Sequence, residues 1–327
     1  MTKKIRIAII GCNNMGQKHL KVLRENFSEQ VEIVGILNST PESSKRRAEE
    51  LNILYFKNID DINPQNVDAV IISTPGNTHA EIGAICLSKG LPCLIEKPMA
   101  STLQGCKKLI EASTKGKSII LTGHTENYNP AVERLKKELE SPIVQIEGIR
   151  TSKNASNKTN ISAIQELMIH DLAIVYSLLG DDLKKIKTSK RQDLSWENHA
   201  IAELEYKNGA KVKLEALREN RDVERYMNIT DKSGNKFHID FMSKSLYKNG
   251  QILTEGGNPL QKELENFLNC IRKKETPKVN AQEATNILKL CLKLEQNTGI
   301  FQQMHVRSLP DKITGHHFAS SIGCSFE

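Results

Sequence analysis

The sequence predicts an α/β protein. We expect a doubly wound parallel sheet of the Rossmann type, followed by an α+β domain with an open, mostly antiparallel sheet. In the first third, continuous apolar runs alternate with amphipathic segments, as strands buried on both faces alternate with helices. After about residue 123 several strands follow one another and two helices close the pattern. A chain of 327 residues is long enough for two cores.

The first domain begins with the apolar run IRIAII, whose β-branched residues leave no polar face and therefore predict a fully buried strand. Strand-like and helix-like segments alternate after it, which predicts a parallel sheet. Pro41 suits the first turn of its helix. The predicted strands are 5–10, 31–37, 67–74, 91–96 and 118–123, and the predicted helices are 15–27, 41–51, 78–88 and 102–114.

The second domain is expected to open with a helix and to continue as a sheet. Asn208-Gly209 predicts a hairpin between two alternating strands. We place the dinucleotide-binding domain at 1–123, a substrate-binding and oligomerisation domain at 124–300 and a loose tail at 301–327. The predicted helices are 130–140, 162–179, 259–273 and 281–297, and the predicted strands are 143–150, 199–209, 210–219, 235–240 and 243–253.

Composition excludes several classes of protein. Lysine and arginine exceed aspartate and glutamate by 46 − 39 = 7, but the excess is scattered and aromatic residues are scarce, so nucleic acid is not an expected partner. Apolar runs are too short for a membrane span, and the chain enters a strand directly after MTKK, without a signal peptide. Seven cysteines without C-x-x-C spacing predict reduced thiols and a cytoplasmic protein. His316-His317 lacks partners at ligand spacing, so no metal site is expected.

The first motif with functional chemistry is the turn GCNNMG, which follows the first strand. Gly11 and Gly16 stand where a dinucleotide-binding turn has its first and third glycines, and Asn13 replaces the second. Asparagine tolerates positive φ, so the turn can be retained. The amide groups at the helix start, around Asn14 and Met15, would then face a pyrophosphate. Taken alone, the turn also fits a strand–helix connection that binds no ligand.

A second motif gives this turn its context. Thr74-Pro75 and His79 follow the third predicted strand, and Glu96-Lys97-Pro98 follows the fourth. This pattern resembles the glucose–fructose oxidoreductase / inositol dehydrogenase (Gfo/Idh/MocA) family. The resemblance implies an NAD(P)-dependent oxidoreductase acting on a CH–OH group. The cofactor contacts that it implies are Thr74, Pro75, His79, Glu96 and Lys97. Lys97 would lie at the carboxyl end of a parallel strand, where ligands bind in such sheets.

A third motif lies in the second domain. The segment IQELMIHD resembles the family's Asp-x-x-x-His-Asp helix, with Glu166, His170 and Asp171 in the corresponding places. Residues four apart share one helix face, so Glu166 and His170 can point together. Histidine is suited to taking a hydroxyl proton as hydride leaves. We predict His170 as the base, Lys97 as its electrostatic partner and Glu166 as a third catalytic residue. Glu166 replaces the family's aspartate and Met168 its glycine. Both changes would alter the pocket, so these motifs do not specify the substrate.

The segment GHTENYNPAVERL narrows the resemblance to the branch that oxidises the 3-hydroxyl of UDP-N-acetylglucosamine. That branch implies a UDP-linked amino sugar, an aminotransferase acting on its 3-keto product, and a homodimer or homotetramer. Alternatives are a free sugar, an inositol or an unsaturated pigment as substrate, and a cofactor-binding sensor without catalysis. The predicted substrate ligands are Lys97, Tyr128, Asn129, Arg150, Lys153, Glu166, His170 and Asp171.

Cofactor choice depends on the end of the second strand, where a carboxylate usually bonds the adenosine ribose. Here that strand ends in Asn38-Ser39, without a carboxylate. An amide still bonds a ribose hydroxyl but does not repel a 2′-phosphate. We therefore predict NAD as the cofactor, with NADP also accepted, and place Asn38 and Ser39 at the ribose.

Overall fold

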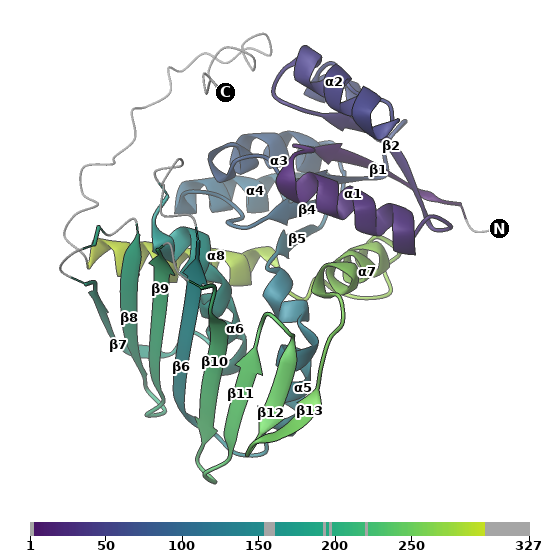
Figure 1. The fold of residues 1–327 in the computed structure, drawn as a ribbon. Coiled ribbons are helices and arrows are strands. Elements are labelled where there is room, and N and C mark those ends of the chain that lie inside the picture. The colour runs from purple at the N-terminus through teal and green to yellow at the C-terminus, as the bar shows by residue number, and fades with distance from the viewer. Residues whose placement is uncertain (1–2, 154–160, 192–193, 196–197, 220–221, 298–327) are drawn as a thin grey trace. The chain divides into compact units, whose positions relative to one another are not determined.

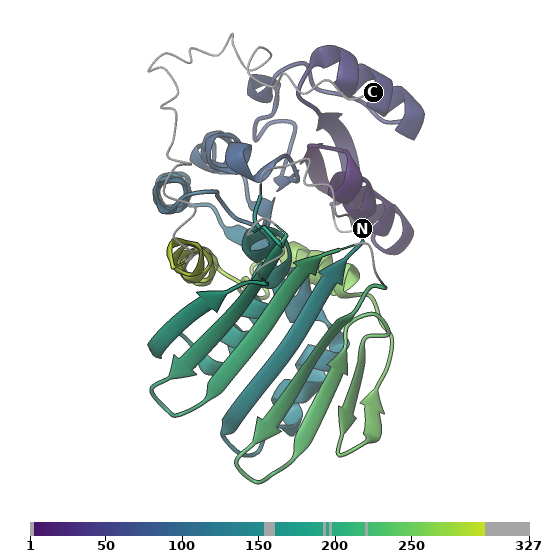
Figure 2. The same cartoon turned by 60° about the vertical axis from the view of Figure 1, so that its left-hand side comes forward.

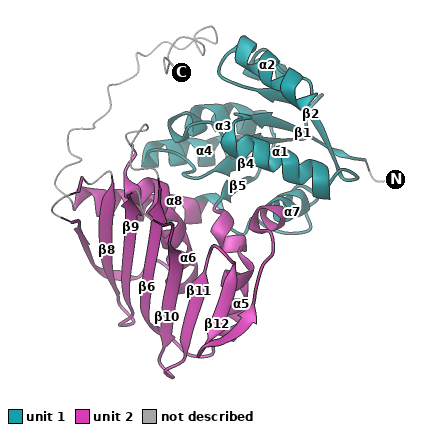
Figure 3. Cartoon of the chain, in the orientation of Figure 1, with its two compact units in different colours: residues 1–123, 264–281, 304–327 teal, residues 124–263, 282–303 magenta. Residues whose placement is uncertain are grey.

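The computed structural model describes residues 3–153, 161–191, 194–195, 198–219 and 222–297. Within them the chain forms two compact units (Figure 3). Unit 1 comprises residues 3–123 and 264–281, and unit 2 comprises 124–263 and 282–297. The predicted tail lies outside the described residues, as do His316-His317.

Unit 1 contains a five-stranded parallel sheet in the order β2-β1-β3-β4-β5, which confirms the predicted Rossmann fold (Figure 1). Every residue of β3, β4 and β5 is buried, as the apolar runs predict. The strands are β1 Ile5–Ile10, β2 Val31–Leu37, β3 Ala69–Ile72, β4 Cys93–Glu96 and β5 Ile120–Gly123. The helices are α1 Asn14–Asn26, α2 Pro41–Leu51, α3 His79–Ser88 and α4 Leu103–Gly116, with short 3-10 turns at Ile59–Asp61 (η1) and Gly76–Thr78 (η2).

The later segment 264–281 belongs to unit 1 because it bonds to that unit directly. Thr122 N on β5 donates to Val279 O at 3.2 Å, and Arg272 Nη1 donates to Gln30 Oε1 at 2.6 Å. The helix α7 (Pro259–Ile271) therefore begins in unit 2 and ends in unit 1.

Unit 2 contains an eight-stranded sheet, mostly antiparallel as predicted, in the order β13-β12-β11-β10-β6-β9-β8-β7; the pair β6–β9 is parallel. Figure 2 shows this sheet, with α5 and α6 on one of its faces. The strands are β6 Ile143–Ser152, β7 Leu183–Ser189, β8 His199–Tyr206, β9 Lys211–Arg218, β10 Arg225–Asp231, β11 Lys236–Asp240, β12 Ser245–Lys248 and β13 Gln251–Thr254. The helical elements are η3 Thr125–Tyr128, α5 Pro130–Glu138, η4 Ile164–Met168, α6 Ile169–Leu179 and α8 Ala281–Gln296.

The structure differs from the prediction at four places in unit 2. Strands β7 and β10 are not predicted, and β7 is a lysine-rich edge strand with weak apolar alternation. Residues 243–253 form two strands rather than one, because Asn249 and Gly250 turn the chain with φ of 52° and 85°. The predicted helix at 162–179 begins with the π-helical turn η4 before α6.

Two further predictions concern composition. Six cysteines lie in the described residues, and all are buried free thiols. Across the described ranges, the helices are too short or too polar to cross a membrane.

Candidate cofactor and substrate sites

The glycine turn between β1 and α1 lies beside the end of β3, at the point where the strand order of the sheet reverses. Gly11 has φ +86°, and a Cβ there would lie 2.6 Å from Thr74 N. A Cβ on Gly16 would collide with the Gly11 carbonyl oxygen. Both glycines are therefore fixed by close backbone packing. Ligands bind at such switch points in open parallel sheets.

Asn13 does not adopt the conformation that we expected. Its φ is −105°, and the positive φ of this turn belongs to Gly11. Asn13 is the N-cap of α1 but its side chain makes no capping bond, whereas Thr40 and Thr102 cap α2 and α4. Asn13 and Asn14 are exposed, Met15 is half-buried, and the first amide groups of α1 lack a side-chain acceptor. An uncapped, exposed helix start fits a pyrophosphate.

Asn38 is buried and engaged inside unit 1. Its Oδ1 accepts from Cys12 N at 2.8 Å, and its backbone N donates to Ser44 Oγ at 2.8 Å. The side chain thus joins the glycine turn to the β2–α2 connection. Ser39, the next residue, is exposed.

His79 joins the Thr74-Pro75 motif of unit 1 to the Glu96-Lys97-Pro98 motif. The ring is buried, with Nδ1 2.8 Å from Pro98 O and Nε2 2.7 Å from Thr74 O. Burial lowers the pKa of His79, although both carbonyl oxygens favour its protonated form. The imidazole therefore ties the Thr74-Pro75 turn to the segment that follows Lys97.

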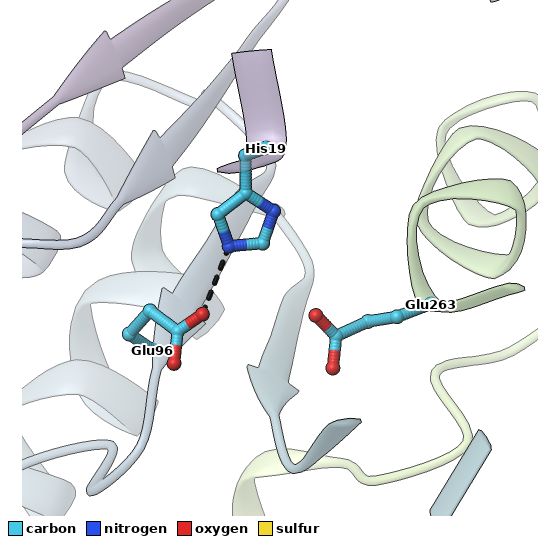
Figure 4. Close-up of side chains that lie close together, drawn as sticks. All are labelled: His19, Glu96 and Glu263. Carbon is cyan, nitrogen blue, oxygen red and sulfur yellow. Dashed lines mark hydrogen bonds and ion pairs between the residues drawn. The ribbon is translucent and has the colours of Figure 1, made fainter. Parts of the chain in front are cut away.

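Glu96 ends β4 and is held from α1 by His19, a residue that belongs to none of the three sequence motifs. His19 Nε2 and Glu96 Oε1 are 2.8 Å apart, and both residues are buried (Figure 4). Burial raises the pKa of Glu96, but the His19 bond and charge outweigh it and leave this pKa below its usual value. Lys97, half-buried, has its backbone N 3.2 Å from Glu96 Oε2. His19 could have been found from its i+3 spacing to Gly16, which places it on the buried face of α1.

In unit 2, His170 lies on the first turn of α6 and is half-buried. Glu166 lies in the preceding π-helical turn and pairs with Arg218 from the end of β9. Arg218 also donates to Ile161 O at 2.8 Å and is buried. Arg218 was not predicted, because nothing in the local sequence links it to Glu166. π-Helical turns are frequent at functional sites.

The other predicted substrate ligands divide into buried and exposed groups. Arg150 and Asp171 form a buried pair, with Nη2 2.8 Å from Oδ1. Tyr128 and Asn129 are buried, and Asn129 Oδ1 accepts from the backbone of α5 as its N-cap. Lys153 is exposed at the end of β6.

Comparison with known proteins finds relatives in sequence and in fold. Residues 5–124 match the sequence model of an oxidoreductase family with an NAD-binding Rossmann fold, GFO_IDH_MocA. The chain is 26% identical over 287 residues to the UDP-N-acetylglucosamine 3-dehydrogenase of Acidithiobacillus ferrooxidans, covering 82% of this chain and 88% of that protein. It is also 26% identical to the inositol 2-dehydrogenase of Paracoccus denitrificans, over 54% of this chain and 55% of that one.

Solved structures share the fold. The UDP-N-acetylglucosamine 3-dehydrogenase GnnA from Acidithiobacillus ferrooxidans superposes with a TM-score of 0.83 at 23% identity, covering 90% of this chain and 98% of that one. The WlbA dehydrogenase from Bordetella pertussis, crystallised with NADH and UDP-GlcNAcA, gives a TM-score of 0.78 at 16% identity, covering 91% and 96%.

Proposed function

We propose that this chain, an NAD-binding oxidoreductase whose residues 5–124 match the Gfo/Idh/MocA family model, oxidises the 3-hydroxyl of a UDP-linked N-acetylamino sugar. One observation carries this proposal. The similarity to a UDP-N-acetylglucosamine 3-dehydrogenase spans 82% of the chain, whereas the similarity to an inositol 2-dehydrogenase spans 54%.

Unit 1 supplies the cofactor contacts in this proposal. The exposed, uncapped start of α1 receives the pyrophosphate through its amide groups, and Gly11 allows the tight turn that leads to it. Bound NAD supplies the acceptor for the hydride that leaves the sugar carbon. Lys97 orients the reacting groups electrostatically, and its backbone is fixed through Glu96 and His19.

Unit 2 supplies the proton acceptor. His170 takes the hydroxyl proton as the carbonyl forms, so that no metal is needed to balance the reaction. Glu166, already paired with Arg218, holds the substrate or the imidazole. Lys153 is exposed and suits the diphosphate of the nucleotide.

The proposal extends to partners and location. The branch resemblance supports a homodimer or homotetramer, a cytoplasmic location, and an aminotransferase that consumes the keto product. Light scattering of the purified chain tests the first of these, and a monomeric mass would contradict it.

The decisive experiment measures NADH formation with UDP-N-acetylglucosamine, UDP-glucose, myo-inositol and glucose, together with thermal shifts for NAD, NADP and each sugar. We expect NADH formation with the UDP-linked amino sugar. Turnover of myo-inositol and of none of the other compounds would identify an inositol, rather than a UDP-linked sugar, as the substrate. A thermal shift with NAD but turnover with none of the sugars would support the sensor alternative.

A further inference from the structure

We propose that Arg150 is a positioning residue, which holds the start of α6, and with it His170, by joining two segments of unit 2. One of these segments is η3 and the other is the first turn of α6. This proposal rests on the proposed function, because it assigns His170 the proton transfer. It gives Arg150 and Asp171 a role different from the substrate contact that their sequence positions predict.

The first arm of Arg150 reaches α6. Its Nε donates to both carboxylate oxygens of Asp171, at 2.9 and 3.1 Å, and its Nη2 donates to Asp171 Oδ1 at 2.8 Å. Both side chains are 2% exposed. Asp171 directly follows His170, so the planar fork of Arg150 fixes the backbone on which His170 is carried.

The second arm reaches η3 and α5. Arg150 Nη1 donates to Glu126 Oε1 at 3.1 Å, and Glu126 Oε2 accepts from Asn129 Nδ2 at 2.9 Å. Asn129 in turn accepts from Ala131 N at 3.1 Å as the N-cap of α5. A continuous chain of hydrogen bonds therefore runs from the start of α5 through Arg150 to the start of α6.

The surroundings indicate an internal clamp rather than a ligand site. Arg150 lies on β6 opposite Arg225 of β10, and its guanidinium stands 4.8 Å from the centroid of the Phe241 ring. The formal charges of the two arginines, Asp171 and Glu126 cancel, although Arg225 makes no ion pair with either carboxylate in the described residues. Burial and Arg150 lower the pKa of Arg225, and burial raises the pKa of Asp171 although Arg150 opposes this. An internally neutralised cluster does not require an anionic substrate to offset its charge.

The location of the clamp explains why the fork matters. His170 is preceded by the π-helical turn η4, whose hydrogen-bond pattern differs from that of α6. Arg150, by contrast, lies on β6, which is paired on both sides within the sheet. A lysine at this position would keep the charge but could not donate in parallel to Asp171 and across to Glu126. Small displacements of a catalytic group cost up to about 100-fold in rate.

The test compares Arg150→Lys with Arg6→Lys in the full-length chain. Arg6 makes a similar forked pair with Asp68, with Nη2 2.8 Å from Oδ1, but lies in unit 1 on β1. Three quantities are measured: hydrogen exchange of the amides of η3 and of the first turn of α6, the affinity for NAD, and kcat and KM for the sugar substrate. Glu126→Ala, which removes the acceptor for Arg150 Nη1 and leaves the Asp171 pair, is the second variant if Arg150→Lys does not fold.

We expect Arg150→Lys to accelerate exchange in both segments and to lower kcat by about 10- to 100-fold, with KM and NAD affinity within about threefold. Arg6→Lys should change none of these. Unchanged exchange in η3 and α6, or faster exchange with kcat within twofold of wild type, would overturn the positioning role. If wild type turns over no sugar, the proposed function fails. The exchange data then decide the clamp separately, and equal exchange in Arg150→Lys and wild type would overturn it.

Discussion

Lys97 follows the last residue of β4, and three buried or half-buried contacts fix the backbone around it. Its own N–H lies against Glu96, Glu96 is bound by His19, and Pro98 O is bound by His79. These contacts fix the position of the backbone from which the Lys97 side chain extends. The proposed electrostatic role requires such a fixed position.

Lys97→Ala should lower kcat by at least about two orders of magnitude, the scale of a lost electrostatic or positioning group. The melting temperature should stay close to that of wild type, because Glu96, His19 and His79 keep their contacts. Steady-state rates and thermal unfolding of the same preparation check both parts. A variant with wild-type kcat would remove the Lys97 side chain from the mechanism.

His170→Ala should abolish oxidation and leave NAD affinity unchanged, because His170 belongs to unit 2 and the cofactor contacts to unit 1. In wild type, kcat should rise with pH through a single transition, since a base must be neutral to accept a proton. Rates measured across the pH range test this when a deuterated substrate shows that hydride transfer limits turnover. A flat profile under that condition would identify a different base.

At the scale of elements, the β1–α1 turn combines a positive φ with close backbone packing. The chain offers a control that separates these two effects. Gly11 has φ +86° with backbone atoms of Ser73 and Thr74 within 2.6–2.8 Å of a built Cβ, whereas Gly209 has φ +90° with nothing within 4 Å.

Gly209→Ala should lower the free energy of unfolding by about 1–2 kcal/mol, the cost of placing a Cβ in this backbone region. Gly11→Ala should cost more, since it adds a collision with the end of β3, and should weaken NAD binding at least about tenfold. Urea unfolding and calorimetric titration measure both quantities. Equal stability losses would show that the backbone yields at Gly11 and that the packing is not restrictive.

The β2–α2 connection determines the choice between NAD and NADP in our proposal. Asn38 already bonds Cys12 and Ser44, so we assign the contact with the adenosine ribose to the exposed Ser39. Ser39→Asp should lower NADP affinity more than NAD affinity, because an exposed carboxylate repels a 2′-phosphate. Asn38→Asp should weaken the binding of NAD and NADP alike. It replaces the amide that lies 3.4 Å from Ser43 O by a carboxylate and disturbs the glycine turn. In wild type the two affinities should lie within about tenfold, or about 1.4 kcal/mol. Selective loss of NADP in Asn38→Asp would return the ribose contact to Asn38.

For the whole molecule, buried carboxylates with opposite pKa shifts give opposite dependences of stability on pH. The folded-state pKa of Glu96 lies below its ordinary 4.5 because of His19, so its stabilising contribution is present above 4.5 and is lost as pH falls through the folded value. Burial raises the pKa of Glu295, so ionisation of this residue opposes folding as pH rises.

The difference in unfolding free energy between wild type and Glu96→Gln should therefore shrink as pH falls from neutral to about 3. As pH rises over the same range, wild type should lose stability relative to Glu295→Gln. Urea unfolding at a series of pH values measures both differences. Parallel pH dependence of the two variants would contradict the assignment of the shifts.

Features that depend on neighbours along the chain can be predicted from the sequence. Buried strands show as apolar runs, the glycine turn as Gly11 and Gly16, and the β8–β9 hairpin as Asn208-Gly209, because each reflects local backbone geometry or periodicity. The polar side chains that support the candidate site are identified only by the packing of the folded chain. The pairs His19–Glu96, Arg218–Glu166 and Arg150–Asp171 join residues 77, 52 and 21 positions apart. Buried polar groups must find partners, and a partner so distant in the chain is chosen by how the strands and helices pack.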